Sequence, residues 1–205
     1  MSYTQCFLEI LAADRQLHFI PVPLTFVARG LKDVFAKKNN KSLRETLAHS
    51  RYKSLAEKVS HQHFDAMDRP LGEYLAELKA SGDDIYRRFL NPHGDKTYCH
   101  FRMGEVPAKR QKGLYLYTVN NEVVYIGRSL DAFGKRVDQG YGKIHPKNCF
   151  IDGQSTNCHI NTLIEMQVED VAFLVCPMVD DSEIKSLEQV LIQERKPRWN
   201  VAIDR

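Results

Sequence analysis

Residues 113–127 read GLYLYTVNNEVVYIG, the clearest structural signal in the C-terminal half of the chain. β-Branched and aromatic residues fill both sides of the pair Asn120-Asn121. Asn tolerates positive φ, which a two-residue hairpin turn requires. The stretch therefore predicts a β-hairpin that places Tyr115 and Tyr125 on adjacent strands, with both hydroxyls able to point across one face.

The segments after the hairpin alternate between helix and strand patterns. Pro197 is expected to end the last helix, and a polar stretch over 143–157 predicts a long loop. The expected elements are a helix at 130–137, a helix at 160–166, a strand at 171–176 and a helix at 182–195. The order β-β-α-α-β-α predicts an α+β domain, a small three-stranded antiparallel sheet flanked by helices.

The first hundred residues read mostly as helices. Apolar residues recur at helical spacing, and Pro70 suits the first turn of a helix. The segments with this pattern are 6–11, 26–35, 43–59 and 71–78. The stretch GEVPAKRQK, residues 104–112, is rich in Gly, Pro and cations and marks a boundary. The sequence thus predicts a mainly helical module over 1–110 and a second domain over 111–205.

The charge is distributed unevenly along the chain. Residues 1–110 hold 18 Lys and Arg against 13 Asp and Glu, whereas residues 111–205 hold 11 against 13. Nine basic residues lie between Arg29 and Lys58. Such a cluster can neutralise nucleic-acid phosphates, and the alternative is a solvated helical face. The first module is therefore expected to bind DNA, to support oligomerisation, or to do both.

The composition excludes several other classes of protein. Hydrophobic content of 43% and charged content of 27% are those of a globular chain. No apolar run approaches the roughly 18 residues of a membrane span, and Glu9 and Asp14 with no basic region before them argue against a secretory signal. Five cysteines without regular spacing indicate reduced thiols. A cytoplasmic protein with no membrane partner is expected.

Two residues beyond the hairpin carry chemical meaning. Gly127 closes the second strand, where a missing side chain lets a ligand backbone come close. Arg136 follows on the next helix, beside Phe133, and a guanidinium held there can grip a phosphate bidentately. The simpler interpretation is that the tyrosines are ordinary residues of amphipathic strands.

Glu188 lies among apolar residues of the last helix. Ile184, Leu187, Leu191 and Ile192 surround it on the helical wheel. A carboxylate in an apolar arc is costly unless a cation or hydrogen bonds compensate it. One carboxylate with waters and a phosphate oxygen can hold Mg²⁺; a structural pair with Arg or Lys is the alternative.

Together these residues resemble the GIY-YIG nuclease superfamily, over residues 113–203. The matching positions are Gly113-Leu114-Tyr115, Tyr125-Ile126-Gly127, Arg136, Glu188 and Asn200. Leu114 replaces the name-giving Ile, and the pattern is most similar to the short phage and restriction-type members. Several members place a His or Tyr four residues after the Arg. Here that position is Gly140, and Tyr141 and His145 are the two accessory candidates.

The resemblance implies a phosphodiester hydrolase, an endodeoxyribonuclease that needs Mg²⁺ or Mn²⁺ and serves restriction, phage or defence functions. It implies that Glu188 holds the metal and that Tyr115 orients or deprotonates the attacking water, for which nearby cations must lower a phenol pKa of about 10. Arg136, with Lys135 as an accessory, neutralises the phosphate.

The remaining residues of the motif have supporting roles in this interpretation. Tyr125 bonds the phosphate or Tyr115, Asn200 fixes the geometry around Glu188, and Gly127 and Arg128 bind substrate. The implied substrate is double-stranded DNA. One such site cuts one strand, so a homodimer or higher homo-oligomer is expected.

Two other readings stay open at this point. One is a catalytically silent GIY-YIG-fold protein that only binds nucleic acid. The other is a zinc protein, although its candidate ligands do not fit a standard ligand spacing. Those candidates are His145, Cys149, Cys158 and His159.

Overall fold

A computed structural model of the 205-residue chain describes residues 8–32, 41–48, 52–83, 85, 89, 97–144 and 155–200. The chain forms two compact units, which are described separately. The first comprises Met1–Gly30, Cys99–Lys143 and Ile160–Arg205; the second comprises Leu31–Tyr98 and Ile144–His159. Within the described ranges, no helix is both long enough and apolar enough to traverse a lipid bilayer.

The predicted hairpin is the centre of the first unit. Strands β5 (Gly113–Val119) and β6 (Glu122–Ser129) pair antiparallel, and β7 (Val171–Pro177) pairs with the other edge of β5. Asn120 and Asn121 have φ of 50° and 67°, which is the left-handed conformation that a tight hairpin turn needs. The three strands expected from the sequence are therefore confirmed.

The expected three-stranded sheet is wrong, because two N-terminal strands extend it to five. Strands β1 (Leu8–Ala12) and β2 (Arg15–Val22) form a hairpin, and β2 pairs with β7 to give the order β1-β2-β7-β5-β6. The turn is Ala13-Asp14, both at positive φ. Burial alternates along β1, with Ile10 and Ala12 inside. This alternation with a period of two is that of a strand. The helix expected for residues 6–11 is therefore wrong.

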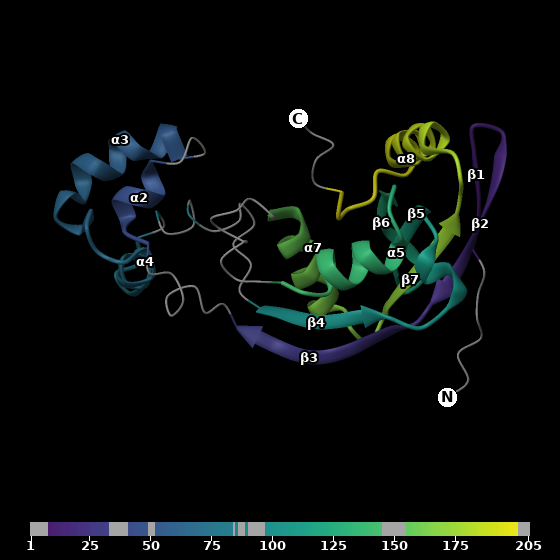
Figure 1. The fold of residues 1–205 in the computed structure, drawn as a ribbon, viewed down its shortest axis with the longest axis horizontal. Coiled ribbons are helices and arrows are strands. Elements are labelled where there is room, and N and C mark those ends of the chain that lie inside the picture. Colours follow the sequence, from purple (N-terminus) through teal and green to yellow (C-terminus); the bar gives the residue numbers. More distant parts are fainter. Residues whose placement is uncertain are drawn as a thin grey trace. The chain divides into compact units, whose positions relative to one another are not determined.

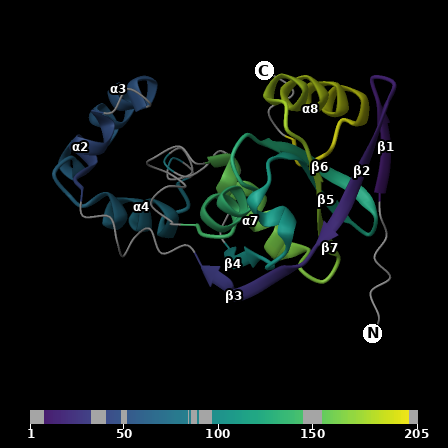
Figure 2. The same ribbon diagram turned by 45° about the vertical axis from the view of Figure 1, so that its right-hand side comes forward.

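The sheet is covered on both faces, which explains why every residue of β5 is buried. Leu114, Leu116 and Ile126 face a core completed by helix α8 (Asp181–Arg195). Alternate residues of β5 face a second core completed by the short helical segments after β6 and by α7 (Ser155–Met166). Figures 1 and 2 show α8 on one side of the sheet and α5 and α7 on the other.

The helices of the first unit begin and end at residues with clear local causes. The Asp180 side chain accepts a hydrogen bond from the Glu183 N–H and caps α8. Lys196, at φ 45°, ends α8 just before Pro197. The helix expected at 130–137 is instead a short α-helix, α5 (Phe133–Lys135), followed by a π-helix, η5 (Arg136–Tyr141).

The mainly helical N-terminal module is wrong in part. Besides β1 and β2, the expected helix at 26–35 is replaced by β3 (Leu24–Lys32), which pairs with β4 (Thr97–Met103) in a two-stranded sheet. Val and Phe in this segment favour a strand over a helix. Residues 1–30 belong to the first unit.

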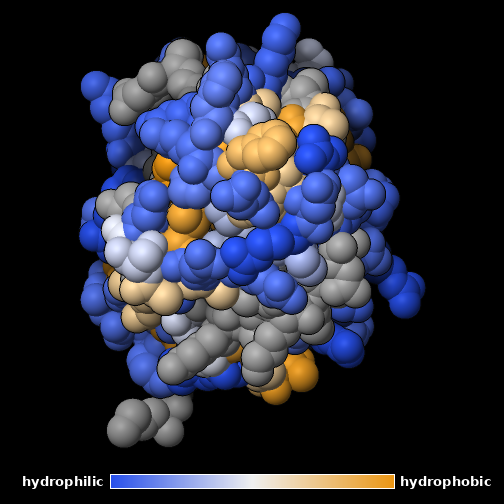
Figure 3. Space-filling view, turned by 90° about the vertical axis from the view of Figure 1, so that its left-hand side faces the viewer, coloured by the Kyte–Doolittle hydropathy of each residue, from blue (hydrophilic) through white to orange (hydrophobic). Residues whose placement is uncertain are grey.

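Helices make up most of the described part of the second unit. They are α2 (Leu43–Leu47), α3 (Lys53–Gln62), the 3₁₀ turn η2 (Phe64–Ala66) and α4 (Leu71–Ala80). A capping box between Ser42 and Glu45 begins α2, and the helices share one apolar core. The helices expected over 43–59 and after Pro70 are thus present. Figure 3 views the molecule from the side on which these helices lie, and the surface seen there is largely hydrophilic.

Candidate functional site

Three tyrosine hydroxyls meet on the face of the sheet opposite α8. Tyr115 from β5, Tyr125 from β6 and Tyr141 from η5 form what we call the tyrosine cluster. The Tyr141 hydroxyl lies 2.7 Å from that of Tyr115 and 3.1 Å from that of Tyr125. Tyr141 therefore bridges the two hairpin phenols, and the two phenols expected to share a face do so.

A single guanidinium contacts two members of the cluster. Arg136 donates through Nε to the Tyr115 hydroxyl at 3.2 Å and through Nη2 to the Tyr141 hydroxyl at 2.8 Å. Its Cζ also lies 4.6 Å from the centre of the Tyr141 ring, a cation–π distance. The side chain is partly buried. Its guanidinium is therefore held in one orientation and is not free to move in solvent.

The π-helix explains why Tyr141 occupies this place. In an α-helix the residue four positions after Arg136 would stack on it, and that residue is Gly140. Between Arg136 and Tyr141 the chain is wound as a π-helix, and the Gly142 N–H bonds to the Val137 carbonyl at 2.7 Å, five residues back. A wider turn brings the fifth residue over the first. Of the two accessory candidates, Tyr141 joins the cluster, and His145 lies outside the described residues.

Gly127 makes room for the Tyr115 ring. The two residues are direct partners across β5 and β6. A Cβ at Gly127 would lie 2.5 Å from Cζ and from the hydroxyl of Tyr115, closer than real Cβ contacts. The space at Gly127 that was expected to admit a ligand backbone is therefore filled by the Tyr115 phenol, which lies across the neighbouring strand.

The substitution Gly127→Ala tests this packing. We expect it to lower the free energy of unfolding by about 1–3 kcal/mol, because an added methyl group must displace a ring in a filled core. Urea unfolding measures the effect. In the Tyr115→Ala background the ring is gone, so the same substitution should cost much less. An equal cost in both backgrounds would contradict the contact.

Asn161 supports the tyrosine cluster through the backbone of Tyr141, and it was not among the residues predicted from the sequence. This fully buried side chain of α7 bonds both backbone groups of Cys99 in β4, at 2.9 and 2.8 Å, and donates to the Tyr141 carbonyl at 2.7 Å. Every polar atom of the amide is used, as burial requires. A lone Asn in an amphipathic helix pattern carries no sequence signal that would distinguish it.

Glu188 faces a cation from the hairpin. Its Oε2 accepts from the Arg128 guanidinium in an ion pair, and its side chain is 14% exposed against 39% for Arg128. Residues 126 and 128 of β6 point to the α8 face, so the strand delivers Arg128 to the helix. The compensating cation that an apolar environment demands is thus Arg128.

The charged groups of the site influence one another. Burial raises the pKa of Glu188, although Arg128 and, more weakly, Arg136 act in the opposite direction. Burial also raises the pKa of Tyr125, and the Glu188 charge adds to that rise. The same burial raises the pKa of Tyr141. Tyr125 and Tyr141 therefore stay protonated hydrogen-bonding groups at neutral pH.

Asn200 binds the hairpin backbone rather than Glu188. Its Oδ1 accepts from the Ile126 N–H at 2.9 Å and its Nδ2 donates to the Ile126 carbonyl at 2.7 Å, while the Trp199 N–H bonds to the Val124 carbonyl at 2.9 Å. Residues 199 and 200, which follow α8, thus hydrogen-bond to the backbone of β6. The amide holds the residue between Tyr125 and Gly127, so it positions the second strand of the hairpin.

Replacing one atom of this amide tests its role. Asn200→Asp keeps the acceptor and removes the donor, leaving the Ile126 carbonyl opposite a carboxylate. We expect a loss of about 1–3 kcal/mol in the free energy of unfolding, measured by urea denaturation. The neighbouring Arg198→Ala removes only a loose, exposed contact with Glu122 and should cost under about 0.5 kcal/mol. Equal effects of the two changes would contradict the assignment.

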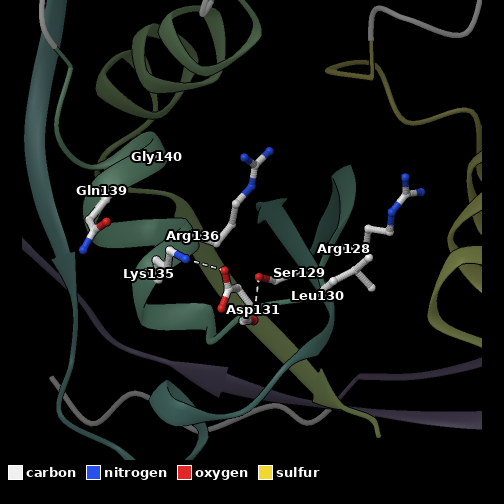
Figure 4. Close-up of a pocket in the computed structure, with 8 residues that line it drawn as sticks. All are labelled: Arg128, Ser129, Leu130, Asp131, Lys135, Arg136, Gln139 and Gly140. Carbon is white, nitrogen blue, oxygen red and sulfur yellow. Dashed lines mark hydrogen bonds and ion pairs between the residues drawn. The ribbon is translucent and has the colours of Figure 1, made fainter. Parts of the chain in front are cut away.

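A cationic pocket of about 480 Å³ opens beside the cluster. Figure 4 shows Arg128 and Arg136 extending into this region from separate elements, with Lys135 directed to Asp131. Arg128, Ser129, Leu130, Asp131, Lys135, Arg136, Gln139 and Gly140 line it. Three cations against one carboxylate favour an anion of phosphate size. Lys135 is already paired with Asp131 and Arg128 with Glu188, which leaves Arg136 as the principal anion ligand without an acidic partner in the pocket.

Several other predicted features are only partly described. His145 and Cys149 lie outside the described residues. Cys158 is disulfide-bonded, so its sulfur is not a free zinc ligand and the expectation of reduced thiols is wrong for this residue. Cys99 and Cys176 are free and buried. Among the described residues, no cluster of three or more His, Cys, Asp or Glu is suited to a metal ion.

Part of the basic N-terminal charge is compensated. Arg29 lies on β3 and pairs with Glu165 and Glu169, and Arg44 pairs with Asp68. The described residues of this stretch therefore offer less free positive charge than the sequence count indicates. Comparison of the chain with protein-family models, curated proteins and solved structures found no match.

Proposed function

We propose that this chain is an endonuclease that hydrolyses DNA phosphodiester bonds with a GIY-YIG type site and Mg²⁺ or Mn²⁺. The observation that carries the proposal is the convergence of Arg136 on the tyrosine cluster at the edge of a cationic pocket. A phosphate in that pocket would meet the Arg136 guanidinium, which the Tyr115 and Tyr141 hydroxyls hold in place; a preorganised cation of this kind stabilises charge in phosphoryl chemistry.

The donor set of the site fits a hard divalent cation. Glu188 offers one carboxylate with its Oε2 on Arg128. Mg²⁺ commonly takes one or two carboxylates and completes its coordination with water and phosphate oxygens, so the single carboxylate of Glu188 is compatible with it. When bound, such a cation supplies Lewis-acid polarisation of the phosphoryl oxygen.

Residues of the chain itself have the other roles in the proposed reaction. Tyr115 orients the attacking water, and Arg136 neutralises charge that grows on the phosphate oxygens. Tyr141 holds both of these groups in place through its hydroxyl, and Asn200 fixes the strand that carries Tyr125. Water adds to phosphorus as the bond to the 3′ oxygen breaks, which leaves 5′-phosphate and 3′-hydroxyl ends.

Incubation of the purified chain with supercoiled plasmid tests the proposal. We expect conversion to nicked and linear forms with Mg²⁺ and none with EDTA. Binding of plasmid without any cleavage in Mg²⁺ or Mn²⁺ would instead support the second candidate, a catalytically silent DNA-binding protein. Retention of the whole cluster together with Glu188 favours the enzyme, since binding alone does not require a carboxylate beside a phosphate site.

Further parts of the proposal concern the setting of the enzyme. We infer a cytoplasmic enzyme of restriction, phage or defence systems, active on double-stranded DNA as a homodimer or higher homo-oligomer. One site cuts one strand, and a symmetric pair cuts both. Because β1 and β2 belong to the sheet, the DNA-binding role of the basic N-terminal residues is best tested by charge substitutions and not by removal of residues 1–105.

A further inference from the structure

Arg128 belongs both to the cationic pocket and to the ion pair with Glu188. Its side chain lines the cationic pocket beside Arg136, and the same guanidinium is the ion-pair partner of Glu188. A guanidinium cannot keep a carboxylate and grip a phosphate in the pocket with the same N–H groups. Arg128 reaches Glu188 through Nη1, so a phosphate that takes this N–H group competes with the carboxylate for it.

The environment of the pair favours an exchange of partners. Glu188 is 14% exposed and Arg128 is 39% exposed, so the arginine is the member with access to solvent and to the pocket. A largely buried carboxylate needs a positive partner whether or not Arg128 is present. A divalent cation on Glu188 satisfies that need and releases Arg128, and a phosphate in the pocket satisfies Arg128 in turn.

We propose that Arg128 is a positioning residue that couples cation binding at Glu188 to phosphate binding in the pocket. This inference rests on the proposed function. Without DNA, Arg128 neutralises Glu188 and keeps the cation affinity low. With a DNA phosphate in the pocket, Arg128 moves to the phosphate and Glu188 is free for the cation. Because such coupling is reciprocal, the cation strengthens DNA binding by the same factor.

Calorimetric titration with Mn²⁺ tests the coupling without reference to activity. We expect Arg128→Ala to bind Mn²⁺ about ten-fold more tightly than the wild type in the absence of DNA. A duplex with non-cleavable phosphorothioate linkages should raise the wild-type affinity for Mn²⁺ by a similar factor. The variant should lose this response. If Arg128→Ala does not fold, Arg128→Gln serves the same purpose, since it keeps the stem of the side chain.

The control is a second arginine pair on the same helix. Arg15 pairs with Glu183 of α8, so Arg15→Ala breaks an Arg–Glu contact without touching Glu188. Its Mn²⁺ affinity should equal that of the wild type. Weaker or unchanged Mn²⁺ binding by Arg128→Ala, or an increase shared by Arg15→Ala, would overturn the coupling.

Glu188→Gln separates this inference from the proposed function. Loss of Mn²⁺ binding in Glu188→Gln, together with no gain in Arg128→Ala, would reject only the coupling. Mn²⁺ binding by Glu188→Gln at the wild-type affinity would reject the metal assignment, and the proposed function would fall with the inference.

Discussion

Glu188→Gln is expected to lower the rate of Mg²⁺-dependent plasmid nicking at least about 10³-fold, the size of effect that follows loss of a principal electrostatic contributor. The amide keeps the shape of the side chain and its place in the apolar arc, but it removes the anionic ligand. DNA affinity should be unchanged or slightly higher, because Arg128 loses its partner and becomes available to phosphate. Nicking rates under single-turnover conditions and a binding titration measure the two quantities.

The matched control is another acid of α8. Glu194 is exposed near the end of that helix, and Glu194→Gln removes the same charge from the same element. It should nick within about two-fold of the wild type, as expected for a surface substitution. A Glu188→Gln protein that nicks as fast as Glu194→Gln would show that the carboxylate takes no part in the reaction.

Arg136→Lys is expected to lower the nicking rate by about 10²–10³-fold. A lysine keeps the positive charge, but its single ammonium cannot contact Tyr115 and Tyr141 in the planar geometry of the guanidinium. The charge would then be less well aimed at the phosphate, and the tyrosine cluster would lose the donor that joins two of its members. The effect should be on the catalytic rate more than on DNA affinity.

An exposed arginine provides the comparison. Arg102 lies on β4 with its side chain toward solvent, and Arg102→Lys should leave the nicking rate within about two-fold. If Arg136→Lys reduces affinity for DNA and leaves the single-turnover rate intact, Arg136 is a binding residue only, and the proposed role in charge neutralisation is wrong.

Local patterns predicted the hairpin well and the full sheet poorly. Asn120-Asn121 between two β-rich runs is an unambiguous turn signal, and the structure has that turn. The β1–β2 hairpin turns at Ala13-Asp14, and Ala is not a typical residue at positive φ. Five-residue strands such as β1 also contain apolar residues that fit a helical spacing as easily as an alternating one. Pairing of β2 with β7 is a long-range contact that no local pattern reveals.

In the candidate site, too, local sequence patterns predicted some residues, whereas the contacts made only through the tertiary fold could not be predicted. Tyr115, Tyr125 and Arg136 could be proposed from the hairpin pattern together with the family resemblance, and the structure brings them together around Tyr141. Tyr141 could not be chosen over His145, because the choice depends on a π-helix and an i+4 spacing assumes an α-helix. The partner of Glu188 was also undetermined, since Arg128 lies 60 positions away in the chain and meets it only through the packing of α8 on β6.

A crystal structure of Glu188→Gln bound to a DNA duplex would locate the substrate phosphate. We expect a backbone phosphate in the pocket, within hydrogen-bonding distance of Arg136, with Arg128 turned to the DNA. A duplex bound on another surface, with Arg136 still held only by the two tyrosines and no phosphate in the pocket, would contradict the proposed site.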